Sequence, residues 1–217
     1  TKPELEMNLS EKEISYQTTN SYSTLNTLTH YTKNVWIVFH GMGYLSRYFS
    51  RYFKQLNPEE NYIIIPQAPN KYYIQPDFKH VGSSWLTKEN TVKDMENILK
   101  YIDAVLNAEA IPEYVNLIIA GYSQGVSIAT RYVARRQLNC NQLILMSGGI
   151  PKELESKDFE FLNAKVTLVY GDKDEYLNAE RIQYEEARAK ELFGSRLEII
   201  PFKGKHIVNM DIINSLV

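Results

Sequence analysis

The chain has 217 residues, of which 44% are hydrophobic and 23% are charged, a composition typical of folded globular proteins and not of disordered ones. Its 24 basic and 26 acidic residues give a formal net charge of −2, so we expect no nucleic-acid partner. The one cysteine, Cys140, excludes an intrachain disulfide, and no apolar run approaches the roughly 18 residues of a membrane span, so we expect no stable membrane insertion.

The amino-terminal sequence TKPELEMNLSEKE is polar and charged and does not resemble a secretion signal, so we expect a cytoplasmic protein. Apolar and polar side chains then alternate on both sides of Asn20 and Ser21, over residues 14–18 and 22–28. Alternation interrupted by polar turn residues is typical of two paired strands. We therefore predict a β-hairpin at the start of the fold.

Short apolar runs rich in β-branched residues follow, and their continuous apolar character predicts parallel strands buried on both faces: Val35–Phe39, Tyr62–Ile65, Val115–Ala120, Gln142–Met146, Val166–Tyr170 and Leu197–Ile200. Apolar residues at helical spacing predict helices over Thr91–Asn107, Gln124–Gln137 and Asn178–Phe193. Such alternation of strands and helices predicts an α/β fold, with a mostly parallel doubly wound sheet and an antiparallel N-terminal hairpin. We expect residues 1–217 to form a single domain.

A serine motif stands where ligand sites lie in such sheets, beyond the carboxyl end of a strand. Gly121-Tyr122-Ser123-Gln124-Gly125 follows the strand Val115–Ala120 directly and opens the next predicted helix. The motif fits G-x-S-x-G, and a strand, a sharp turn and a helix form the context of a nucleophile elbow. A chance match in a loop is the alternative, which these flanking elements disfavour. The pattern therefore predicts that Ser123 is a nucleophile held at the positive end of a helix dipole.

A serine hydroxyl needs a base, which an acid in turn orients. On a nucleophile-elbow fold the chain order is serine, acid, histidine, and of the four histidines only His206 follows Ser123. His206 also comes after a predicted strand. We therefore predict that His206 is the base.

The acid is expected after the strand Val166–Tyr170, where three carboxylates stand close together. Asp174 is the favoured residue. Asp172 lies nearer the strand and is expected to bind backbone amides of the turn. Glu175 is the third choice and is expected to be solvated.

An acyl-transfer site also needs backbone N–H groups at the place where negative charge develops on the oxygen. Gln124, the residue after Ser123, is predicted to supply one, and Met42 in the loop His40-Gly41-Met42-Gly43 the other. His40 is expected to buttress this loop and not to act as a base. The segment Pro66–Asn90, rich in proline and aromatic residues, is predicted to be an irregular loop that either walls an acyl pocket or only covers the core.

Beyond the serine motif, further stretches occur in a characteristic order: VFHGMG (38–43), YIIIPQAP (62–69), SSW (83–85), IIAGYSQG (118–125), LILMSGG (143–149), VYGDKDE (169–175) and GKH (204–206). Together they resemble the phospholipase/carboxylesterase family of α/β-hydrolases, which includes acyl-protein thioesterases and small bacterial carboxylesterases. The resemblance implies the α/β-hydrolase fold. It also implies a triad and two oxyanion-hole N–H donors, on the residues Ser123, Asp174, His206, Met42 and Gln124. The family often has H-G-x-G-D, whereas Tyr44 follows Gly43 here, so activity on lipidated proteins is not carried over.

These observations predict a serine carboxylesterase that hydrolyses short- to medium-chain acyl esters through an acyl-enzyme, without a metal or organic cofactor. The expected partner is a small-molecule acyl ester. Only about 16 residues separate the strand that ends near Gly149 from the one that begins near Lys165, too few for a cap domain. Two alternatives share the residues: a hydrolase-fold binding protein or receptor with little turnover, and a thioesterase acting on acylated substrates.

Overall fold

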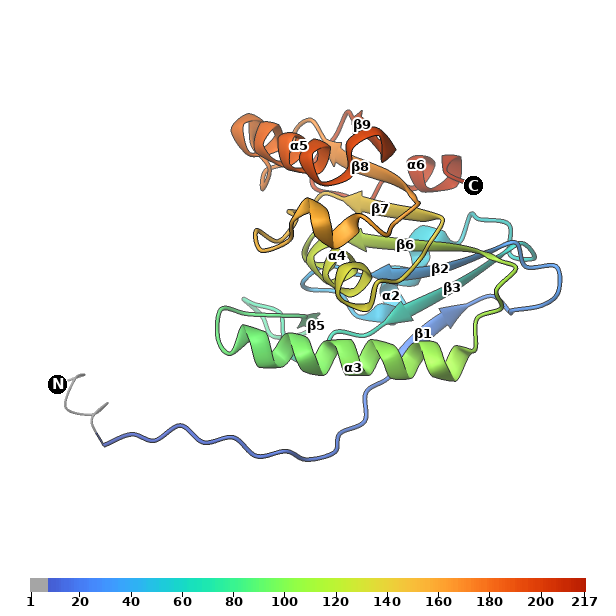
Figure 1. Ribbon diagram of the computed structural model, residues 1–217. Coiled ribbons are helices and arrows are strands. Elements are labelled where there is room, and N and C mark those ends of the chain that lie inside the picture. The colour runs from blue at the N-terminus through green and yellow to red at the C-terminus, as the bar shows by residue number, and fades with distance from the viewer. Residues whose placement is uncertain (1–7) are drawn as a thin grey trace.

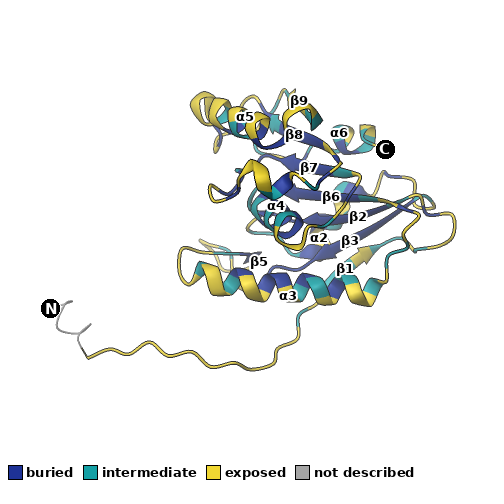
Figure 2. Ribbon diagram, viewed as in Figure 1, coloured by how far each residue is buried: buried dark blue, intermediate teal, exposed yellow. Residues whose placement is uncertain are grey.

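A computed structural model describes residues 8–217 (Figure 1). Its centre is a seven-stranded sheet in the order β1-β3-β2-β6-β7-β8-β9, in which all neighbours are parallel except β1 and β3. The six parallel strands predicted from the sequence are confirmed: β2 (Asn34–Phe39), β3 (Asn61–Pro66), β6 (Asn116–Tyr122), β7 (Gln142–Met146), β8 (Lys165–Gly171) and β9 (Leu197–Phe202). The apolar character of the first five follows from burial on both faces, which Figure 2 shows for the centre of the sheet, whereas β9 at the edge has no buried residue.

The antiparallel edge is confirmed, but the predicted hairpin is wrong. Strand β1 (Tyr22–Leu25) pairs with β3, and residues 9–20 form no strand. The side chain of Asn20 donates to the carbonyl of Gln67 and so attaches this part of the chain to the end of β3. Residues 14–18 therefore do not pair with the strand that follows Asn20 and Ser21. Ile14 and Tyr16 are consequently exposed. Residues 1–7 of the stretch considered for a secretion signal lie outside the described residues.

Helices cover both faces of the sheet, as expected of a doubly wound fold (Figure 1). The three predicted helices are confirmed and pack on one face: α3 (Thr91–Glu109), α4 (Gln124–Arg136) and α5 (Ala179–Phe193). The other face carries shorter elements: α2 (Ser46–Phe49), the 3-10 helix η1 (Ser50–Phe53) and α6 (Met210–Ser215). Within residues 8–217 no helix has the length and apolar character that crossing a membrane requires.

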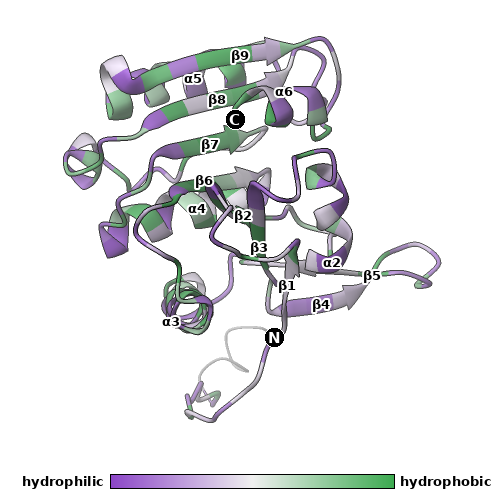
Figure 3. Cartoon of the chain, turned by 90° about the vertical axis from the view of Figure 1, so that its right-hand side faces the viewer, coloured by the Kyte–Doolittle hydropathy of each residue, from purple (hydrophilic) through white to green (hydrophobic). Residues whose placement is uncertain are grey.

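The segment Pro66–Asn90 is more regular than predicted. It contains an antiparallel pair, β4 (Asn70–Tyr73) and β5 (Val81–Ser84), which Figure 3 shows beside the main sheet. The prediction of an irregular loop failed because β4 is exposed at every position and β5 consists mostly of small residues, so neither has a buried apolar stripe. Trp85, directly after β5, is fully buried against Phe39. This part of the segment therefore covers the core.

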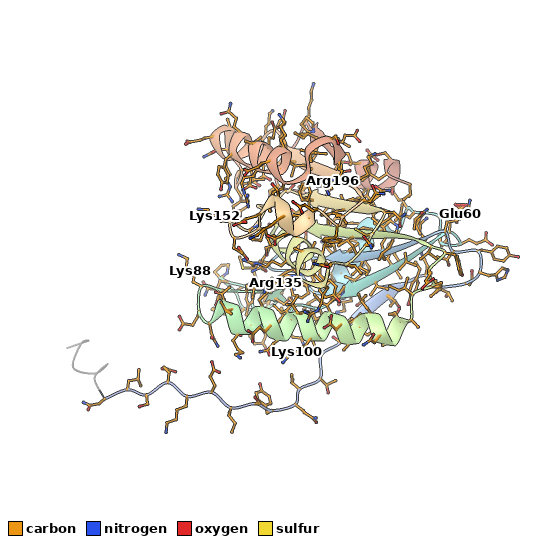
Figure 4. All side chains as sticks on the ribbon, viewed as in Figure 1. Glu60, Lys88, Lys100, Arg135, Lys152 and Arg196 are labelled. Carbon is orange, nitrogen blue, oxygen red and sulfur yellow. The ribbon has the colours of Figure 1, made fainter. Side chains whose placement is uncertain are left out.

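The connection between β7 and β8 contains only the short 3-10 helix η2 (Ser156–Phe159). A second 3-10 turn, η3 (Gly194–Arg196), leads from α5 into β9. Charged side chains such as Lys88, Lys100 and Lys152 are exposed on the outer surface (Figure 4). No domain is inserted after β7, which agrees with the predicted absence of a cap there.

Candidate active site

The serine motif forms the sharp turn between β6 and α4 that the sequence predicts. Ser123 has φ 55° and ψ −119°, a left-handed backbone conformation that L-residues adopt only under strain. Its N–H donates to the carbonyl of Met146 at 2.8 Å, which anchors the turn to β7. A Cβ at Gly121 would collide with the backbone of Gly125. The two glycines therefore allow strand and helix to approach closely enough to hold Ser123 in this conformation.

Ser123, His206 and Asp174 come from three separate loops and lie in one chain of hydrogen bonds. His206 Nε2 is 3.0 Å from Ser123 Oγ, and His206 Nδ1 is 2.7 Å from Asp174 Oδ2. A carboxylate can only accept, so Nδ1 carries the proton and donates to Asp174. The unprotonated Nε2 then faces the serine hydroxyl. This geometry allows the imidazole to take the hydroxyl proton of Ser123.

The three carboxylates after β8 have different environments. The side chain of Asp174 is fully buried, and its Oδ1 also accepts the N–H of Tyr176 at 2.8 Å. Asp172 is exposed, and its Oδ1 accepts the N–H of Gly204 at 3.0 Å. Glu175 Oε1 accepts the backbone N–H of His206 at 3.2 Å. Of the three, Asp174 is thus the one in contact with the imidazole.

Two tyrosines that the sequence did not single out surround His206. Tyr122 donates its hydroxyl to the carbonyl oxygen of His206 at 3.1 Å, and the two rings are 5.2 Å apart. Tyr176 packs edge-on against the imidazole, with ring centroids 4.8 Å apart, and is otherwise exposed. Tyr122 occupies the variable position of G-x-S-x-G, so the motif itself gave no signal of this contact.

The loop after β2 borders the serine. A Cβ placed on Gly41 would lie 3.2 Å from Ser123 Cβ, and the next residue, Met42, is largely exposed. His40 is fully buried; its Nδ1 donates to the carbonyl of Gly41 at 2.8 Å, and its Nε2 accepts the N–H of Ala68 at 3.1 Å. Burial lowers the pKa of His40 to about 4, so its ring is neutral at pH 7. These contacts hold the loop and leave His40 away from the serine–imidazole pair.

Gln124 joins the serine turn to the segment after β5. Its Oε1 accepts the N–H of Trp85 at 2.9 Å, and its Nε2 donates to Ser84 Oγ and to the carbonyl of Leu86 at 3.0 and 2.9 Å. The indole of Trp85 in turn donates to the carbonyl of His40 at 2.8 Å. At the first position of α4, the backbone N–H of Gln124 has no carbonyl of a preceding helical turn to bind. It is therefore free of intrahelical pairing beside Ser123.

Metal-binding clusters and surface hollows are two other kinds of functional site that the described part of the chain could contain. Within residues 8–217 no group of three or more His, Cys, Asp or Glu side chains lies close enough to hold a metal ion. A surface hollow of about 420 Å³ is lined by Asn26, Thr27, Thr29, Tyr31, Pro58 and Glu59. Asn26 and Glu59 lie beside the amino end of β3, whereas Ser123 lies beyond the carboxyl end of β6. The hollow is thus separate from the serine site.

Comparison with known proteins places these features in context. Residues 22–211 match the phospholipase/carboxylesterase family. The structure resembles that of acyl-protein thioesterase 2 from Zea mays, with a TM-score of 0.68 at 15% identity over 91% of this chain and 97% of that one. It also resembles the structure of esterase PE8, with a TM-score of 0.68 at 17% identity over 90% of this chain and 96% of that one.

A third similar structure is a phospholipase/carboxylesterase from Dyadobacter fermentans, with a TM-score of 0.64 at 18% identity over 93% of this chain and 97% of that one. No curated protein matches the sequence. At these identities the structural similarities establish the α/β-hydrolase fold, while the match over residues 22–211 covers most of the chain. The chain therefore belongs to the phospholipase/carboxylesterase family of α/β-hydrolases.

Proposed function

We propose that the protein is a serine carboxylesterase that hydrolyses short- to medium-chain acyl esters through a Ser123 acyl-enzyme. The observation that carries the proposal is the hydrogen-bonded chain from Ser123 through His206 to the buried Asp174. Membership of a family of ester hydrolases supports it. The Zea mays thioesterase has the same fold, so thioester hydrolysis is the second candidate.

In the proposed first step, Ser123 Oγ attacks the ester carbonyl carbon while His206 Nε2 takes the hydroxyl proton. The carbonyl oxygen becomes an oxyanion that accepts the backbone N–H groups of Met42 and Gln124. Collapse of this intermediate breaks the bond to the alcohol, which leaves with the proton from His206. The acyl group is then an ester of Ser123.

In the second step, His206 Nε2 takes a proton from water, whose oxygen attacks the acyl-enzyme carbonyl. As the tetrahedral intermediate collapses, the bond to Ser123 Oγ breaks, the protonated His206 returns its proton to that oxygen, and the carboxylic acid is released. Asp174 holds the imidazole with Nδ1 protonated and stabilises the imidazolium that exists during both attacks. The proposed roles of Ser123, His206 and Asp174 require no metal or organic cofactor.

A fluorophosphonate probe with matched serine variants tests the nucleophile. Ser123→Ala should lower kcat on a nitrophenyl ester on the order of 10⁶-fold and abolish labelling. Ser127→Ala, one turn further along α4, removes a hydroxyl bonded to the Gln124 carbonyl and should leave kcat and labelling nearly unchanged. Hydrolysis by Ser123→Ala at a near wild-type rate would refute the proposal. Labelling of the wild type without turnover would instead favour a binding protein or receptor.

Acyl preference can be measured with nitrophenyl esters of increasing chain length, each assayed across its critical micelle concentration. The short β7–β8 connection leaves this side of the site uncapped, so rates should rise smoothly with substrate and favour short to medium chains. Matched thioesters would distinguish the second candidate. Sharp activation at the micelle threshold, or an optimum at long chains, would show that a segment closes over the site.

A further inference from the structure

The main chain of His206 has little support from regular structure. His206 follows β9, the edge strand of the sheet, in a loop whose neighbouring residues Lys205 and Ile207 are exposed. A base must nevertheless stay within hydrogen-bond reach of the serine, because misplacement by about 1 Å can cost on the order of 10²-fold in rate. The contacts that fix the His206 backbone therefore matter for the proposed chemistry.

Both backbone polar groups of His206 are bound by side chains. Its N–H donates to Glu175 Oε1 at 3.2 Å, and its carbonyl oxygen accepts the hydroxyl of Tyr122 at 3.1 Å. The ring of Tyr122 also packs against the imidazole with centroids 5.2 Å apart. His206 is thus held from two sides, independently of the contacts of its own side chain.

The two supporting residues are chain neighbours of the residues that contact the imidazole. Tyr122 directly precedes Ser123, and Glu175 directly follows Asp174. Each segment therefore supplies one contact to the His206 side chain and one to its backbone. We propose that Tyr122 and Glu175 are positioning residues that set the distance between His206 Nε2 and Ser123 Oγ, an inference that rests on the proposed esterase function.

Of the two residues, Tyr122 should hold the His206 backbone more firmly. It is 3% exposed, and burial raises its pKa, so its hydroxyl remains a proton donor throughout the working pH range. Glu175 is exposed, and water competes for its carboxylate. Loss of the Tyr122 hydroxyl leaves the ring packing in place but frees the His206 carbonyl. We expect the larger effect on turnover from Tyr122.

Tyr122→Phe tests the hydroxyl, and Tyr132→Phe is its matched control. Tyr132 is 4% exposed and donates its hydroxyl to Asp103 at 2.7 Å, away from the site. Tyr122→Phe should lower kcat on the order of tenfold with KM within about twofold, since loss of the contact perturbs positioning more than substrate binding. Tyr132→Phe should leave kcat unchanged. Both should lower the melting temperature by similar amounts.

Glu175 is tested by a pair of substitutions. Glu175→Gln keeps an acceptor oxygen for the His206 N–H and should retain kcat, whereas Glu175→Ala removes it and should lower kcat about threefold. The double variant Tyr122→Phe/Glu175→Ala should lose more than the product of the single effects, because either contact alone still restrains the same residue. A strictly multiplicative loss would contradict a shared action on His206.

A spectroscopic readout separates this inference from the proposed function. The Nδ1 proton shared between His206 and Asp174 should give a low-field ¹H resonance that Tyr122→Phe broadens or shifts and Tyr132→Phe does not. This signal does not depend on hydrolysis, so it still reports on positioning if Ser123→Ala shows that the esterase proposal is wrong. An unchanged resonance, or a kcat loss no larger than that of Tyr132→Phe, would overturn the inference.

Discussion

Different contacts hold the two sides of the site in place: the serine turn, residues 121–125, and the histidine loop, residues 203–207. Ser123 follows β6, the fourth of seven strands, whose last five residues are buried. The turn is enclosed by backbone: a Cβ on Gly125 would collide with the Phe39 carbonyl, and one on Gly148 with the Ser123 carbonyl. His206 follows β9, an edge strand with no fully buried residue. The loop before His206 packs on β8, where a Cβ on Gly171 would collide with the carbonyls of Gly204 and Lys205. His206 itself, however, is held by hydrogen bonds from side chains of other loops.

The difference predicts how each half of the site responds to substitution. Close backbone packing is part of the core, so damage to the serine turn should appear first as lost stability. A side-chain hydrogen bond contributes only about 0.5–1.5 kcal/mol to stability but sets geometry, so damage to the histidine loop should appear first as lost turnover. Variants that separate the two readouts therefore test the comparison.

Among the substitutions that test this comparison, Asp174→Asn, which removes a contact of the His206 side chain, should cause the largest loss of turnover. The amide would no longer favour the Nδ1-protonated ring, and kcat should fall roughly 10⁴-fold with the fold intact. Turnover and melting temperature of the purified variant are the measurements. A variant that retains turnover would remove Asp174 from its proposed role.

Asp172→Asn is the matched control. Its carboxylate binds the Gly204 N–H and does not contact the imidazole, and asparagine keeps an acceptor oxygen for that N–H, so turnover should stay near that of the wild type and any effect should be a small loss of stability. The reverse pattern, with turnover lost in Asp172→Asn and retained in Asp174→Asn, would move the acid to Asp172.

On the serine turn, Gly125→Ala should lower the free energy of unfolding. Its methyl group would meet the carbonyls of Phe39 and His40, so β2 or α4 must shift, at a cost of about 3 kcal/mol or more. Gly194→Ala is the control, because no neighbouring atom lies within 4 Å of the added methyl group and only the positive φ of 55° opposes the change, at about 1–3 kcal/mol. Urea unfolding of both variants measures the difference. Equal losses would show that the turn is not tightly enclosed.

His40, buried in the loop that borders Ser123, should make the stability of the serine side depend on pH. Its pKa is about 4 in the folded protein against 6.5 for an ordinary histidine, so the unfolded chain binds a proton that the folded protein excludes between these values. The contribution of the neutral His40 ring to the free energy of unfolding is complete above pH 6.5. It declines as the pH falls towards 4, by up to about 3 kcal/mol in total.

Urea unfolding of the wild type and of His40→Gln at pH 7.5, 5.5 and 4.5 isolates this contribution. His30→Gln controls for the loss of an exposed histidine side chain. If His40→Gln does not fold, the ring resonances of His40 in the wild type can be followed by NMR. A His40 signal that titrates near pH 6.5 would contradict burial of the neutral ring.

Cys140 should show the smallest effect, since it lies before β7 at the amino end of the sheet. Burial raises the pKa of its thiol to about 12, so the native protein at pH 8 should resist iodoacetamide and react only after unfolding. Cys140→Ala should leave kcat within about twofold, as expected for a residue outside the site. A faster reaction in the native state would show that this end of the sheet opens.

The parallel strands other than the edge strand β9 could be predicted well because burial on both faces selects apolar residues and leaves a continuous apolar run. Prediction from the sequence failed at residues 14–18, where alternation suits a strand but no partner strand lies beside it. It also missed β4, whose residues are all exposed and leave no pattern. Alternation and burial thus predict strands only where packing enforces them.

The site shows the same limit. The loops that carry Ser123, Asp174 and His206 could be predicted because each follows a recognisable strand. The contacts of Tyr122 and Glu175 with the His206 backbone could not, because they join residues 84 and 31 positions apart and depend on how the loops meet. A hydroxyl or carboxylate beside a motif looks the same in sequence whether it faces solvent or a distant carbonyl.

The position of β9 also bears on biosynthesis. It is the final strand of the sheet in chain order, and His206 follows it, whereas the serine turn is complete 83 residues earlier. Chains are synthesised at about 5–20 residues per second, so a nascent polypeptide carries Ser123 for seconds before His206 exists. During that interval the strained serine lacks the base proposed to activate it. Under the proposed mechanism, hydrolytic competence begins only when β9 docks, so an incompletely synthesised chain is inert towards esters around the ribosome.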